Sequence, residues 1–162
     1  MVPEELVERI KSLLGDFAKE IKIWKNDYIE VEVDKENIEE VAKRMKEFGF
    51  DHVKDLTVVD YMKEGFFRII YNLGSYDNFE LSYYIVGIAY NIPRDKPVTK
   101  TLYYIYTSAD FQEREAYEAF GITFEGHPDL RPVLLSPPVA ELKPLRKDFV
   151  VKEDPEIIAK KK

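Results

Sequence analysis

The stretch that decides the fold is residues 79–90, Phe-Glu-Leu-Ser-Tyr-Tyr-Ile-Val-Gly-Ile-Ala-Tyr. Both alternating faces of this run are apolar or aromatic. Because successive side chains of a strand point to opposite sides of a sheet, this pattern predicts a central strand that is buried on both sides. We expect the two N-terminal helices to cover one side of it and something else to cover the other.

The residues before this run predict a pair of amphipathic helices with a half-buried strand between them. Apolar residues recur at helical spacing over 3–20 and over 36–48. Asp34 can cap the start of the second helix, and Gly49 is a natural stop. Residues 28–33 alternate apolar and acidic side chains, as a strand with one buried face does.

Further apolar and β-branched runs predict strands at 55–60, 66–72 and 100–106. A short third helix is expected at 111–120, with Asp110 and Glu113 as a capping box. The predicted fold is therefore α+β, with a mostly antiparallel or mixed sheet packed by the N-terminal helices.

The character of the chain changes after the third helix. Regular structure is interrupted by Pro128, Pro132, Pro137, Pro138 and Pro144. Leucine and valine nevertheless stay frequent in this segment, unlike in a flexible polar linker. We expect an α+β domain over 1–125 and an extended, proline-rich interface tail over 126–162.

Composition excludes several classes of function. The net charge of −7 argues against a nucleic-acid partner. The absence of cysteine excludes disulfides, thiol catalysis and thiolate ligation of an iron–sulfur cluster, and 2 histidines are too few for a histidine-rich metal site. No run approaches the roughly 20 apolar residues of a membrane span, so we expect a cytoplasmic protein that reaches a membrane only through partners. Its 34% charged residues resemble the composition of a thermophile protein.

Residues 113–131 hold the highest density of special residues. In the segment 113–118, Glu-Arg-Glu-Ala-Tyr-Glu, Arg114 and Glu118 are spaced to pair along a helix. The alternative is an ordinary solvated helix face. Pro128 favours an extended conformation for His127, and Asp129 can hydrogen-bond the backbone of the turn.

Two enzymatic or binding alternatives compete with a structural role. A small hydrolase would use His127 as a general base with Glu115 or Glu118, although no nucleophile, phosphate loop or metal set accompanies them. A single-stranded RNA-binding platform would use the tyrosines of the predicted strands, but it lacks a basic frame. Those tyrosines are Tyr83, Tyr84, Tyr90, Tyr103, Tyr104 and Tyr106.

The combined pattern resembles a known family, the 30 kDa subunit of complex I (NADH:quinone oxidoreductase, the respiratory NADH dehydrogenase), with relatives in membrane-bound NiFe-hydrogenase-type complexes. The matching residues are Glu113-Arg114-Glu115, Phe120-Gly121-Ile122, Phe124, Gly126-His127-Pro128-Asp129-Leu130-Arg131 and Pro144-Leu145-Arg146-Lys147-Asp148-Phe149. Glu118 stands where the family has Asp, Pro132 replaces a second Arg, and 136–143 lacks the usual acidic, Trp-containing stretch. These departures favour a hydrogenase-type relative over a standard NADH dehydrogenase.

The resemblance implies a cofactor-free subunit of the peripheral arm, without an active site of its own. Iron–sulfur clusters, and a nickel–iron centre in hydrogenase-type complexes, would belong to partner subunits. Those partners would be the hydrogenase-like large (49 kDa-type) subunit and the small iron–sulfur subunit, with the membrane arm reached indirectly from the cytoplasmic face. The chain would hold them in place for electron transfer coupled to ion translocation. The residues implied at the subunit interface are Glu113, Arg114, Glu115, Tyr117, Glu118, Phe120, Gly121, His127, Pro128, Asp129, Leu130, Arg131, Arg146 and Asp148.

Overall fold

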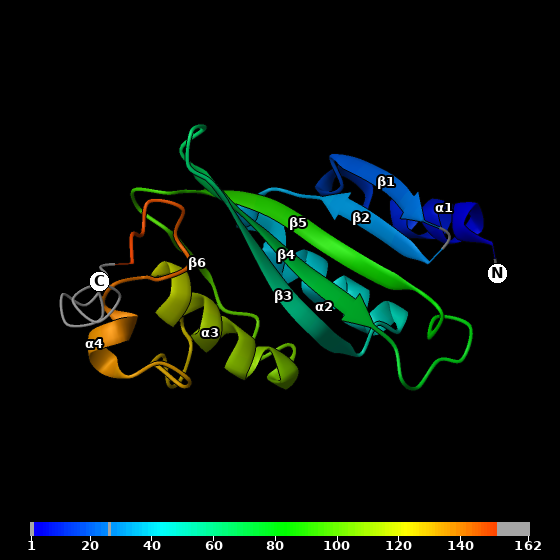
Figure 1. The fold of residues 1–162 in the computed structure, drawn as a ribbon. Coiled ribbons are helices and arrows are strands. Elements are labelled where there is room, and N and C mark those ends of the chain that lie inside the picture. Colours follow the sequence, from blue (N-terminus) through cyan, green and yellow to red (C-terminus); the bar gives the residue numbers. More distant parts are fainter. Residues whose placement is uncertain (1, 26, 152–162) are drawn as a thin grey trace, which may run out of the picture.

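The computed structural model describes residues 2–25 and 27–151, so the end of the predicted tail, 152–162, lies outside the described residues. Helices lie before, between and after groups of consecutive strands (Figure 1). In chain order they are α1 (Pro3–Leu14), β1 (Glu20–Lys25), β2 (Tyr28–Glu32), α2 (Ile38–Phe48), β3 (His52–Tyr61), β4 (Phe66–Gly74), β5 (Ile85–Pro93), β6 (Val98–Lys100), α3 (Asp110–Phe120), β7 (Thr123–Glu125) and α4 (Pro137–Ala140).

A mixed sheet of 5 strands forms the centre of the molecule, in the order β1-β2-β5-β4-β3. β2 and β5 run parallel, and the other neighbours run antiparallel. The fold is α+β as expected, and the strand built from the second half of 79–90 is the middle strand. β6 and β7 make a separate parallel pair beside α3.

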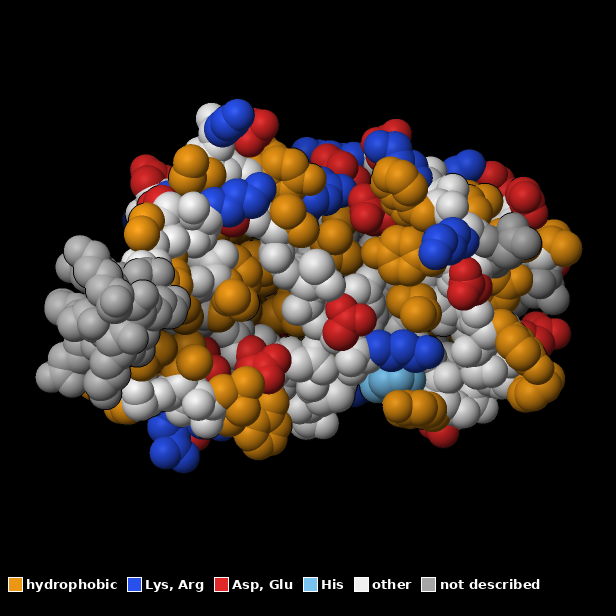
Figure 2. Space-filling view, in the orientation of Figure 1, with side chains coloured by type: hydrophobic (Ala, Val, Ile, Leu, Met, Phe, Trp, Pro, Cys, Tyr) orange, Lys and Arg blue, Asp and Glu red, His pale blue; other side chains and the backbone are white. Residues whose placement is uncertain are grey.

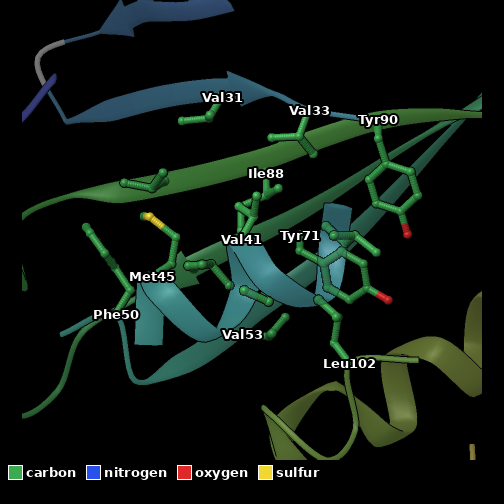
Figure 3. Packing of buried hydrophobic residues seen from close by; sticks show 14 of the residues in the cluster. Val31, Val33, Val41, Met45, Phe50, Val53, Tyr71, Ile88, Tyr90 and Leu102 are labelled. Atoms are coloured by element: carbon green, nitrogen blue, oxygen red, sulfur yellow. The ribbon is translucent and has the colours of Figure 1, made fainter. Parts of the chain in front are cut away.

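The core lies between the sheet and the N-terminal helices. Ile29, Val31 and Val33 are buried on one face of the sheet, as the alternation at 28–33 predicts. Val41 and Met45 of α2 pack against them (Figure 3). Hydrophobic burial of this kind stabilises by roughly 25 cal/mol per Å² of apolar surface, so the helix face and the strand face fix each other.

On the opposite face of the sheet no helix lies among the described residues (Figure 1). Polar side chains cross it instead, since Arg68 contacts Glu30 at 2.8 Å and Tyr28 donates a hydrogen bond to Asn72 at 3.0 Å. Gly87 makes this close packing possible, because a Cβ there would lie 2.5 Å from the Tyr28 hydroxyl. The cover on this face therefore comes from side chains of the neighbouring strands, which pack over the small residues of the central strand.

The expected helix over 3–20 is too long. α1 ends at Leu14, where Gly15 adopts a φ of 54° that other residues rarely accept. Phe17 lies in a following 3-10 turn, and Ile21 belongs to β1, where it pairs with Val31. The helical spacing of these apolar residues was therefore coincidental.

Three other details differ from prediction. Asp34 makes no capping hydrogen bond to α2, because a 3-10 turn over Lys35–Asn37 comes first and the Asp34 carboxylate pairs with Lys19. Gly49 does end α2 as predicted. Residues 79–84 form turns and not a strand, and of 100–106 only Lys100 is in a strand.

In the part of the chain that the structure describes, no helix has the length and apolar character needed to cross a bilayer.

Candidate functional site

Helix α3 buries charged side chains that a surface helix would expose. Glu113 is 0% exposed, Glu118 2% and Arg114 8%. The alternative interpretation, an ordinary solvated helix face, is therefore wrong for these three residues. Arg114 and Glu118 do not pair with each other either, since both turn toward the C-terminal tail.

Glu113 lies at the junction of α3 and the sheet. Its carboxylate accepts hydrogen bonds from the Tyr71 hydroxyl at 2.9 Å, the Leu102 N–H at 2.8 Å and the Thr101 hydroxyl. It makes no capping box with Asp110, because it points into the core. Burial raises the pKa of Glu113 to about 7, although these hydrogen bonds oppose the shift. Figure 3 shows Tyr71 of β4 close to Leu102, on the side where α3 lies.

Glu118 holds the proline-rich tail. Its carboxylate accepts hydrogen bonds from the consecutive backbone N–H groups of Val133, Leu134 and Leu135, at 2.8 to 3.2 Å. A proline-rich segment lacks a ladder that would pair its N–H groups, and buried backbone donors must be satisfied. One buried carboxylate therefore fixes the path of the tail across α3.

We predict that Glu118→Gln loosens the tail, because an amide has one acceptor oxygen and its NH₂ group would face backbone donors. A loss of about 2 kcal/mol in local stability corresponds to amide exchange at Val133 to Leu135 roughly 30-fold faster. Hydrogen exchange with mass spectrometry measures this. Glu115→Gln, a change at the exposed neighbour, is the control and should leave exchange unchanged. Equal protection in both variants would contradict the anchoring role.

His127 ties down the turn that follows β7. Its ring is 0% exposed, and Nδ1 accepts a hydrogen bond from the Asp129 N–H at 3.1 Å. The proton must therefore sit on Nε2, which faces the Asp110 carboxylate at 3.3 Å. Arg114 completes the turn by donating to the Arg131 carbonyl at 3.1 Å.

Arg146 and Asp148 anchor the end of the tail. Arg146 donates from Nε to the carbonyl of Phe120, the last residue of α3, and so satisfies a helix-end acceptor. Asp148 pairs with Arg94 at 2.6 Å. Arg94 also donates to both carboxylate oxygens of Asp60, at 2.9 and 3.1 Å, and the Lys147 N–H donates to Asp60.

These anchors leave an apolar groove of about 370 Å³ open at the surface. Figure 2 shows a hollow lined by hydrophobic side chains where α3 and the tail meet the sheet. Leu134 and Leu145 stand at its rim, 70% and 61% exposed. The groove is lined by Leu56, Val58, Gln112, Glu115, Ala116, Glu118, Ala119, Phe120, Leu134, Leu135, Pro144 and Leu145.

The structure thus separates the predicted interface residues into internal anchors and exposed positions. Those with side chains engaged inside the chain are Glu113, Arg114, Glu118, His127 and Arg146. The exposed ones are Glu115, Pro128, Asp129, Arg131 and Asp148, and the partly buried ones are Tyr117, Phe120, Gly121 and Leu130. Their assignment to a subunit interface stays a prediction.

The hydrolase alternative finds no support in this geometry. The His127 ring is closed off from solvent, Glu118 is engaged with the backbone of the tail, and Glu115 is exposed. A general base that no substrate can approach cannot act as one. The tyrosines do not form a platform either, because Tyr90 and Tyr106 are buried and their hydroxyls bond to Thr99 and to backbone carbonyls.

Sequence reasoning missed the residues that receive these anchors. These residues are Asp60, Arg94, Thr101 and Tyr71, and they lie outside the signature segment, residues 113–131, in sequence. One signal existed in the sequence, because Asp60 follows directly on a β-branched run. In the structure Asp60 lies within β3 and is only 3% exposed. A carboxylate buried in a strand requires a cation or donors, and here Arg94 provides them.

Known proteins resemble this chain in sequence. Residues 31–155 match the family of the respiratory-chain NADH dehydrogenase 30 Kd subunit. A subunit of the F(420)H(2) dehydrogenase of Methanosarcina mazei is 33% identical over 144 residues, which covers 86% of this chain and 89% of that protein. NADH-quinone oxidoreductase subunit 5 of Thermus thermophilus is 35% identical over 129 residues, which covers 75% of this chain but only 61% of that protein.

Solved structures show the same fold. A chain of the membrane-bound sulfane sulfur reductase, an archaeal respiratory membrane complex, superposes with a TM-score of 0.80 at 30% identity, covering 98% of this chain and 89% of that one. A trypsin-resistant fragment of Nqo5 superposes with a TM-score of 0.65 at 27% identity, covering 78% of this chain and 98% of the fragment. The relatives are subunits of multi-subunit respiratory complexes. The chain belongs to the respiratory-chain NADH dehydrogenase 30 Kd subunit family.

Proposed function

We propose that this chain is a non-catalytic, cofactor-free subunit of a complex-I-like or membrane-bound hydrogenase-type oxidoreductase. It holds a hydrogenase-like large subunit and a small iron–sulfur subunit in register for electron transfer coupled to ion translocation. Family membership supports the setting, and the lack of cysteine means that the chain cannot ligate a cluster through thiolates. Its place is the cytoplasmic face of the membrane, which it reaches through its partners.

The observation that carries this proposal is the apolar groove between β3, α3 and the tail. Buried carboxylates and arginines fix the walls of the groove, so its shape exists before any partner arrives. Ala116 and Ala119 contribute only small side chains to it, while Leu134 and Leu145 leave apolar surface exposed. A preformed apolar site with a rigid frame lowers the entropy cost of binding, as a docking surface for a permanent partner requires.

Leu145→Glu tests this assignment. The side chain is 61% exposed, so the change should alter the free energy of unfolding by no more than about 0.5 kcal/mol. A carboxylate at the rim would have to be desolvated in the complex, so we expect recovery of the large subunit to fall about tenfold. The measurement is affinity purification of the tagged chain from gently solubilised membranes, with quantitative mass spectrometry of the other subunits.

Val150→Glu is the matched control, because Val150 is 77% exposed in the same tail but does not line the groove. It should leave recovery unchanged. Full recovery with Leu145→Glu would remove the groove from the interface. A wild-type chain that purifies alone would overturn the scaffold function itself.

A further inference from the structure

Residues 75–84, which connect β4 to β5 and are named here the aromatic loop, present large aromatic side chains to solvent. Tyr76 is 79% exposed, Phe79 75% and Tyr83 64%. Phe79 and Tyr83 meet edge to face, with ring centroids 5.2 Å apart, and a surface hollow of about 360 Å³ lies beside them. Contiguous exposed aromatic surface on a small domain marks an interaction site more often than chance exposure does.

The aromatic loop is held rigidly in spite of its exposure. The Asp51 carboxylate accepts the backbone N–H groups of Tyr76 and Asp77 at 2.8 and 2.9 Å, and the Asn78 side chain accepts from Glu80 and Leu81. Leu81 and Tyr84 are buried beneath the loop. The ring of Tyr76 stacks on His52 with centroids 3.6 Å apart. Because the backbone is fixed, little entropy is lost when the aromatic rings bind a partner.

Charge narrows the kind of partner. The loop contains Asp77 and Glu80 and no lysine or arginine. This combination repels an anionic lipid surface and a nucleic acid. It complements an apolar protein surface that is bordered by lysine or arginine, since such pairs steer association and fix register.

The aromatic loop and the groove lie at opposite ends of the sheet (Figure 1). Hydrophobic side chains gather over the lower right edge of the molecule, at the loop's end, in Figure 2. We propose that the aromatic loop is a second docking surface, which binds an apolar, basic-rimmed surface of a partner protein. The chain then connects two separate protein surfaces through its rigid sheet.

Photo-crosslinking in cells tests the proposal independently of the groove. A benzophenone amino acid replaces Phe79, and the adduct is purified through a tag on this chain and sequenced by mass spectrometry. We expect a protein peptide with apolar residues flanked by lysine or arginine. Adding Asp77→Lys and Glu80→Lys should reduce the adduct about tenfold, because both charges would then repel the basic rim.

The same benzophenone at Trp24, an exposed aromatic residue on edge strand β1, is the matched control. Equal crosslinking at Trp24 to the same peptide, a lipid adduct only, or no adduct at Phe79 would each overturn the proposal. Thermal unfolding of each variant shows whether the fold is kept. Because Leu145→Glu acts at the groove and leaves the loop intact, a failure of the scaffold function and a failure of this docking surface give different results.

Discussion

Asp60→Asn is expected to destabilise the protein by about 3 kcal/mol, as removal of one partner from a buried ion pair does. The Asp60 side chain is 2% exposed and the Arg94 side chain 16%. Burial alone would raise the pKa of Asp60, but the hydrogen bonds from Arg94 and from the Lys147 N–H hold it below its usual range. The amide would turn an NH₂ group toward Arg94 and leave the guanidinium group with the exposed Asp148 as its charged partner. Urea unfolding followed by circular dichroism measures the change in the midpoint.

Asp148→Asn provides the matched comparison, because Asp148 contacts the same guanidinium group from the surface. Its side chain is 54% exposed, and exposed pairs contribute only about 0 to 1 kcal/mol. The difference between the two variants isolates the effect of burial. Equal losses in both would show that the strength of the Arg94 site does not depend on the buried carboxylate.

Glu113 should make the protein less stable as the pH rises from 5 to 8. Its pKa is about 7 in the folded chain and near 4.5 when unfolded, so the folded state binds the proton more tightly. The contribution to stability is fully present below about pH 4.5 and is lost as the pH passes through about 7. The difference in pKa corresponds to about 3 kcal/mol. Urea unfolding at a series of pH values measures the slope.

Glu113→Gln isolates this titration from every other one. An amide oxygen can still accept from Tyr71 and Leu102, and the side chain has the same shape. The difference in unfolding free energy between wild type and variant should therefore change by about 3 kcal/mol between pH 5 and 8, in favour of the variant at high pH. A pH slope that stays the same in Glu113→Gln would show that Glu113 is not its source.

Local periodicity predicted much of the fold. The alternation at 28–33, the amphipathic spacing of α2 and the glycine stop at Gly49 all appear in the structure. Prediction failed where the period was ambiguous, as in the extension of the first helix from Leu14 to residue 20, and where the tyrosine-rich residues at 101–106 form turns. In these places long-range contacts, and not local propensity, decide the conformation.

The signature segment shows the same division. Its composition was enough to point to the family, and its charge density marked it as special. The residues that contact these side chains in space could not be predicted from the sequence. Glu113 accepts a hydrogen bond from Tyr71, 42 positions away, and Asp60 accepts one from the Lys147 N–H, 87 positions away. A charged residue in a helical pattern looks solvated until the elements that surround it are known.

By itself, the sequence determined the α+β class, the central strand, the approximate positions of α1, α2 and α3, and the likeness to a redox-complex subunit. The reason is that side-chain periodicity and local motifs depend only on residues close together in the sequence. Only the tertiary structure decided that Glu113, Arg114, Glu118 and Arg146 are internal anchors, that a groove stays open between β3, α3 and the tail, and that the aromatic loop is rigid and exposed. The physical reason is burial. Whether a charge is solvated or satisfied inside depends on donors and acceptors that the fold brings together from distant positions.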